Sequence, residues 1–77
     1  PLEDILKRHL DKVRELVRLS EEVNKLAKEV LDILKDKRVD EKELDKVLKE
    51  LEKVVEEYER AVKESRDLLR ELRETTR

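Results

Sequence analysis

The stretch KRVDEKEL, residues 37–44, decides the fold because it separates two long runs of helical periodicity. Asp40 is a favourable N-cap residue, and Glu43 stands three positions later, where a capping box places its acid. Val39 and Leu44 have the spacing of a hydrophobic staple, which fixes the angle at which a chain enters a helix. Because these signals coincide, they predict a short turn just before Asp40.

The run before this turn shows helical periodicity over residues 2–36. Two adjacent rows of residues, each repeating every seven positions, form the a/d pattern of a coiled coil. These rows are Leu6, Val13, Ser20, Ala27, Leu34 and Leu2, His9, Leu16, Val23, Val30. Two flanking rows are also largely apolar: Leu10, Val17, Asn24, Leu31 and Ile5, Leu19, Leu26, Ile33. The apolar face is therefore roughly 160° wide, and we expect this helix to have neighbours on more than one side.

The run after the turn has a narrower apolar face. Its seam is Leu44, Leu48, Leu51, Val55, Tyr58, Val62, Ser65, Leu69, Leu72, Thr76, and its apolar flank is Val47, Val54, Ala61, Leu68. We predict one all-α domain over residues 1–77, an antiparallel hairpin with helices at about 2–36 and 40–76 and a turn at about 37–39. One continuous helix is the alternative, since no glycine ends the first run.

The composition excludes several classes of function. Glycine, cysteine and methionine are absent, 55% of the residues are charged, and the 20 basic and 22 acidic residues nearly cancel. We therefore expect no phosphate-binding loop, disulfide, nucleic-acid partner or membrane partner. His9 stands alone, without the residues of a metal site or a catalytic centre. We expect no enzyme activity, cofactor, metal or small-molecule substrate. With no targeting or transmembrane segment, we expect a soluble, cytoplasm-compatible chain of unknown location.

A lone hairpin cannot cover an apolar face this wide. Soluble monomers seldom expose a continuous apolar strip along the whole length of a helix. We therefore expect assembly into a four-helix or six-helix coiled-coil-like bundle. The candidate apolar interface residues are Leu6, Leu10, Val13, Leu16, Val17, Leu19, Val23, Leu26, Val30, Leu31, Leu48, Leu51, Val54, Val55, Val62, Leu68, Leu69 and Leu72.

Five polar residues interrupt the apolar rows: His9, Ser20, Asn24, Tyr58 and Ser65. In a hairpin that turns near residue 39, Ser20 is level with Tyr58, and His9 lies within about one turn of Ser65. A buried polar group without a partner costs about 1–3 kcal/mol, so a hydrogen-bond network here would penalise wrong pairings. The alternatives are local: each serine can bond within its own helix, and the other three side chains can contact water.

Taken together, these features resemble de novo designed helical hairpins that form obligate bundle oligomers with buried hydrogen-bond networks, especially the designed heterodimers. The resemblance spans the whole chain and includes the short loop before Asp40–Leu44, the acidic helix starts, the basic helix ends and the polar layers. It implies a protein–protein interaction module that pairs with a cognate hairpin, with the five polar residues as network members. Copies of the same chain, in a dimer or trimer, are the nearest alternative partner. A monomeric binder of a natural target is a third possibility.

Overall fold

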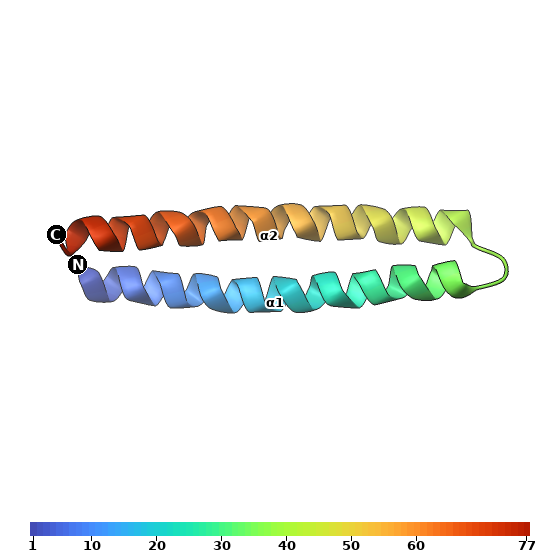
Figure 1. Ribbon diagram of the computed structural model, residues 1–77, viewed down its shortest axis with the longest axis horizontal. Helices are drawn as coiled ribbons and strands as arrows, with labels where there is room; N and C mark the ends of the chain where they lie inside the picture. Colours follow the sequence, from blue (N-terminus) through green and yellow to red (C-terminus); the bar gives the residue numbers. More distant parts are fainter.

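The computed structural model describes residues 1–77 as two long helices packed side by side (Figure 1). Helix α1 spans Leu2–Lys35 and α2 spans Glu41–Thr75. The two helices run antiparallel, so both termini lie at one end of a rod measuring 59 × 14 × 13 Å. The predicted all-α hairpin is confirmed.

The turn, residues 36–40, is set by capping. The Asp40 carboxylate accepts hydrogen bonds from the amides of Lys42, at 3.1 Å, and Glu43, at 3.2 Å. These bonds satisfy two amides that have no partner within the helix. The reciprocal half of the expected capping box is not formed, since no hydrogen bond joins the Glu43 carboxylate to the Asp40 amide. Asp36 turns to an extended backbone (ψ 145°), which ends α1 one residue earlier than the periodicity suggests.

The contact between the helices is centred on a different row of α1 than the sequence predicts. Leu19 and Leu26 are 1% and 3% exposed, and Ile5 is also buried. These residues belong to a predicted flank, whereas Leu6, Val13 and Leu34 of the expected a/d pattern are exposed. The row containing Leu16, Val23 and Val30 is half-buried beside the contact.

On α2, too, the predicted flank takes part in the helix contact. Of the three buried residues of α2, Val47 and Ala61 belong to its predicted flank and Ser65 belongs to its predicted seam, so both rows pack against α1. Ala61 is 2% exposed and has no side chain beyond Cβ, which allows α1 to approach closely. Since α1 is apolar on four adjacent rows, several pairs of rows could pack on α2. Val47 and Ala61 from the flank of α2 are buried together with Leu19 and Leu26 of α1.

The resulting core is thin. Only 6 of the 77 residues are buried, and 11 large apolar side chains are exposed. Short chains bury a small fraction of their surface, and a two-helix rod buries less than a compact domain of equal length. The hairpin therefore leaves most of its large apolar side chains at least partly open to solvent.

Candidate interaction surface

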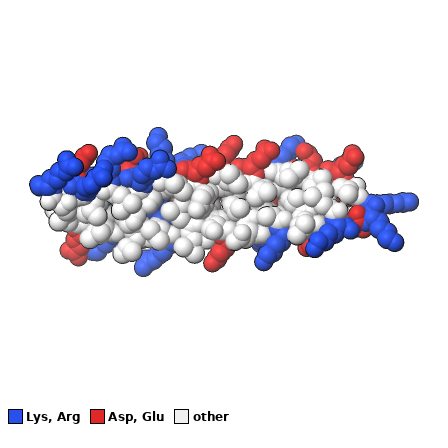
Figure 2. All heavy atoms as spheres, viewed as in Figure 1, with Lys and Arg blue, Asp and Glu red and all other residues white.

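The exposed apolar side chains of both helices lie on one side of the rod. We call this surface the apolar face. It consists of Leu6, Leu10, Val13, Val17, Leu31 and Leu34 from α1, with Leu48, Tyr58 and Leu69 from α2. Heptad spacing keeps these residues in continuous rows from the termini to the turn. In Figure 2 uncharged atoms occupy the middle of the visible side along its whole length, with charged groups along both borders.

The candidate apolar interface residues divide into three groups by exposure. Leu19 and Leu26 are buried between α1 and α2, so they form the hairpin core and present no free surface. The exposed candidates are Leu6, Leu10, Val13, Val17, Leu31, Leu48 and Leu69. The half-buried candidates are Leu16, Val23, Val30, Leu51, Val54, Val55, Val62, Leu68 and Leu72. The exposed group is the part of the predicted interface that a second molecule could cover.

His9 and Ser65 come together across the two helices. The Ser65 hydroxyl lies 3.3 Å from Nδ1 of His9, and Ser65 is 8% exposed. When the imidazole proton is on Nε2, the hydroxyl donates to Nδ1; in the other tautomer it accepts from Nδ1–H. Spacing placed these residues within about one turn of each other, and the structure joins them directly. His9 is half-buried beside the apolar face.

The other three polar residues do not join this pair within the single chain. Ser20 and Asn24 are exposed on α1, in the rows that form the apolar face. Tyr58 is 36% exposed on α2, and no hydrogen bond links it to Ser20. No buried side-chain polar atom is left without a hydrogen-bond partner. The hairpin therefore completes one polar contact and leaves three hydrogen-bonding side chains at the surface.

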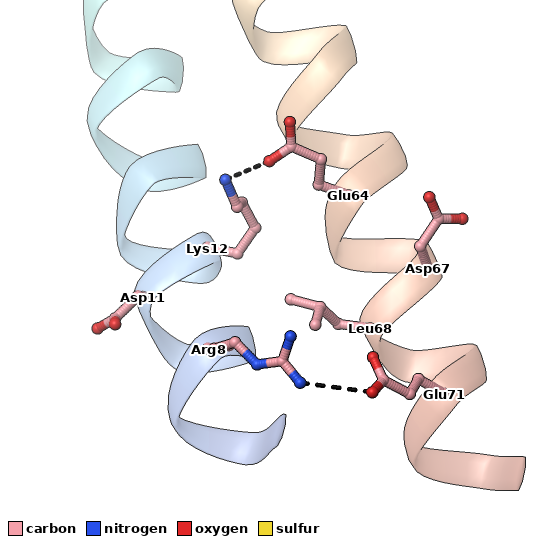
Figure 3. A pocket seen from close by; sticks show the side chains of 7 residues that line it. All are labelled: Arg8, Asp11, Lys12, Glu64, Asp67, Leu68 and Glu71. Carbon is pink, nitrogen blue, oxygen red and sulfur yellow. Dashed lines mark hydrogen bonds and ion pairs between the residues drawn. The ribbon is translucent and has the colours of Figure 1, made fainter. Parts of the chain in front are cut away.

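A second side of the hairpin carries cross-helix ion pairs. Figure 3 shows a groove in which Arg8 and Lys12 of α1 reach toward α2. The Arg8 guanidinium donates to Glu71 at 3.4 Å. Lys12 forms an ion pair with Glu64 and donates to Glu15, 3.0 Å away, on its own helix. Leu68 is the one apolar side chain that lines the groove. The other lining residues are charged, and four of them form ion pairs across the groove.

The Lys12–Glu64 pair shifts the titration of both groups. The hydrogen bond from Lys12 lowers the pKa of Glu64 below its usual 4.5, and the positive charge of Lys12 adds to this effect. The hydrogen bonds to Glu64 and then Glu15 raise the pKa of Lys12 above its usual 10.5. The Lys12 side chain is 23% exposed and that of Glu64 is 45% exposed, so water screens the pair substantially. The pair joins α1 to α2 in the same groove as Arg8 and Glu71.

These ion pairs between the helices were not predicted from the sequence, although one signal for them was present. The row Ile5, Leu19, Leu26, Ile33, which is buried at its first three residues and half-buried at Ile33, skips one heptad position, and Lys12 occupies it. A cation in an otherwise apolar row calls for an acid on the neighbouring helix. Glu64 becomes identifiable only once the packed face of α2 is known. The interrupted row therefore indicates that Lys12 forms an ion pair, but it does not identify Glu64 as the acid.

No family model, curated protein or solved structure matches this chain. No group of three or more His, Asp or Glu side chains is arranged to hold a metal ion. Neither helix is both long and apolar enough to cross a lipid bilayer.

Proposed function

We propose that this chain is a de novo designed protein–protein interaction module, one hairpin of a heterodimeric four-helix bundle. The observation that carries the proposal is the apolar face, which runs the length of both helices. Leu10, Val17 and Leu31 are each at least half exposed, although such side chains gain about 1.5–3 kcal/mol from full burial. A second hairpin laid along this face would cover both helices at once and give each a second helical neighbour.

In this proposal the five polar residues set partner specificity. Asn24 and Ser20 lie among the apolar rows of α1, and Tyr58 lies on α2. A docked hairpin would remove water from these groups, so it must supply matching donors and acceptors. A mismatched hairpin would leave them unpaired, at about 1–3 kcal/mol for each group. The His9–Ser65 contact supports the idea that polar residues of this chain pair across helices.

A homo-oligomeric scaffold is the second candidate function. One observation favours it: α1 contributes most of the exposed apolar side chains, including Leu6, Leu10 and Val17. This asymmetry suits a homotrimer of hairpins in which α1 lies inside and α2 outside. The heterodimer would cover the exposed apolar side chains of both helices, whereas the homotrimer would cover mainly those of α1.

Native mass spectrometry of the purified chain separates the two candidates. The heterodimer proposal predicts a shifting mixture of weak oligomers, because the cognate hairpin is absent. One closed dimer or trimer would instead favour the scaffold. As a matched test of specificity, Asn24→Leu should preserve helix content and weaken discrimination between cognate and mismatched designed hairpins in a pull-down. Unchanged discrimination would remove Asn24 from the specificity role.

A further inference from the structure

Two rows of charged residues border the apolar face. Each row lies one helical step, four residues, beyond an exposed apolar row. We call them the α1 edge and the α2 edge. The α1 edge consists of Lys7, Arg14, Glu21, Lys28 and Lys35, and the α2 edge consists of Asp45, Glu52, Glu59, Arg66 and Arg73. All ten residues are exposed, so a hairpin docked on the apolar face would bring its own edges alongside them.

The charges along these edges are not distributed evenly. The α1 edge is basic near the termini and basic again near the turn, with Glu21 at its middle. The α2 edge changes sign along its length: Asp45 and Glu52 are acidic near the turn, and Arg66 and Arg73 are basic near the termini. Figure 2 shows this change along the α2 border, which is mostly blue near the termini and mostly red toward the turn. Each edge has one half near the termini and one half near the turn, which gives four half-edges. Three of these four half-edges are basic, although the net charge of the chain is −2.

The ion pairs formed within each helix do not cancel this pattern. Lys7 pairs with Glu3 at 3.7 Å, Arg14 with Asp11 at 3.7 Å, and Asp45 with Lys49 at 3.0 Å. Their side chains are 65–84% exposed, so these contacts are solvated and contribute little. The four basic residues Lys28, Lys35, Arg66 and Arg73 form no ion pair in the hairpin. The edges therefore remain available to a partner.

A second copy of this chain cannot match the pattern. Two identical hairpins stacked face to face are related by a two-fold axis lying in the interface. With the axis across the helices, each α1 edge meets the other α1 edge in reverse, so Lys7 and Arg14 lie opposite Lys35 and Lys28. With the axis along the helices, α1 edges meet α2 edges, so Lys7 and Arg14 approach Arg66 and Arg73. In each arrangement half of the edge contacts join like charges.

We propose that the occupant of the apolar face is a different helical hairpin. The edge of this partner that lies opposite the α1 edge of the present chain is acidic along its whole length. Along α2 its edge is basic opposite Asp45 and Glu52 and acidic opposite Arg66 and Arg73. This inference rests on the proposed function and adds the charge of the partner to it. Only a non-identical hairpin satisfies all four half-edges, so edge charge and core polar residues select against self-pairing by independent means.

The test uses an acidic-edge variant of the same chain as a model partner. The variant carries Lys7→Glu, Arg14→Glu, Lys28→Glu and Lys35→Glu and keeps the apolar face unchanged. When it docks in reverse on the wild-type chain, acidic half-edges meet basic ones along α1, and opposite charges also meet along α2. Native mass spectrometry of an equimolar mixture at low salt should show mixed dimers in clear excess over their statistical share. This excess should fall at high salt, which screens exposed pairs.

A control variant makes the same change in net charge away from the edges. It carries Arg18→Glu, Lys25→Glu, Lys46→Glu and Lys53→Glu, all at exposed positions outside the apolar face and its edges. Mixed dimers with this control should stay near the statistical share. Dimers that form in statistical proportion with the acidic-edge variant would overturn the charge inference and leave the docking face intact. Complete absence of oligomers for every chain, at any salt concentration, would overturn the proposed function as well.

A smaller variant keeps the test valid if the fourfold change impairs folding. Lys28→Glu with Lys35→Glu makes the α1 edge self-complementary in the reversed arrangement, since two acids then face Lys7 and Arg14 of the other copy. Exposed ion pairs each change affinity by a small factor, and several act together here. We expect self-association to strengthen roughly tenfold or more, although the chain becomes more acidic. Association that is unchanged or weaker, with helicity retained by circular dichroism, would contradict the proposal.

Discussion

Leu26 and Leu31 provide a matched pair of substitutions on α1. Leu26 is 3% exposed in the contact with α2, and Leu31 is 50% exposed on the apolar face. Leu→Ala at a buried site lowers the free energy of unfolding by about 2–5 kcal/mol. Because a thin core can relax around the cavity, we expect a loss of about 2 kcal/mol for Leu26→Ala. The same change at Leu31 removes a side chain that is half in water, so it should lower hairpin stability by only about 1 kcal/mol.

The order of the two effects reverses when association is measured. A partner covers the remaining half of Leu31, and this burial contributes about a further 1 kcal/mol to association. Leu31→Ala should therefore weaken the affinity about fivefold for each variant chain in the complex. Leu26 is already covered, so Leu26→Ala should leave association unchanged wherever the hairpin remains helical. Denaturant unfolding followed by circular dichroism measures the first quantity, and sedimentation over a concentration series measures the second. Equal shifts in association for both variants, or none for Leu31→Ala, would refute the division into core and docking face.

Three further predictions concern single contacts. Ser65→Ala removes the hydroxyl bonded to His9 and should lower the free energy of unfolding by about 0.5–1.5 kcal/mol in denaturant titrations; no change would show that water replaces the bond. Because Lys12 lowers the pKa of Glu64, this pair stabilises the fold above pH 4.5 and the effect fades as acid protonates Glu64. Thermal melts of wild type and Glu64→Gln should therefore differ at neutral pH and converge in acid, and a constant difference would contradict this. Asp40→Ala should cost about 1 kcal/mol while Asp40→Asn retains the cap, and equal losses would argue against capping by the side chain.

The hairpin itself was predictable because the deciding signals are local. An N-cap and the spacings of a capping box and a hydrophobic staple are encoded within a few residues of Asp40, and heptad rows identify every apolar side chain that is buried. The packed row of α1 was not predictable, because four adjacent rows are apolar and periodicity alone does not rank them. The Glu43 half of the capping box failed for a similar reason: sequence spacing permits the bond without orienting the side chain.

The candidate site was predictable in outline and not in detail. The width of the apolar face on α1 implied that some rows would remain uncovered, and the structure leaves Leu6 and Leu10 exposed. An antiparallel hairpin that turns near residue 39 predicted that His9 and Ser65 lie within about one turn of each other, and in the structure their side chains are in hydrogen-bond contact. Cross-helix ion pairs such as Arg8–Glu71 depend on side-chain reach, which heptad spacing does not specify.

Sedimentation equilibrium of the purified chain by itself, from low to high micromolar concentration, measures whether the uncovered apolar face drives association. If the hairpin leaves apolar surface that must be covered, the average mass exceeds that of one chain and rises with concentration, and the unfolding midpoint rises with it. A mass of one chain at every concentration, with cooperative unfolding that is independent of concentration, would contradict the account.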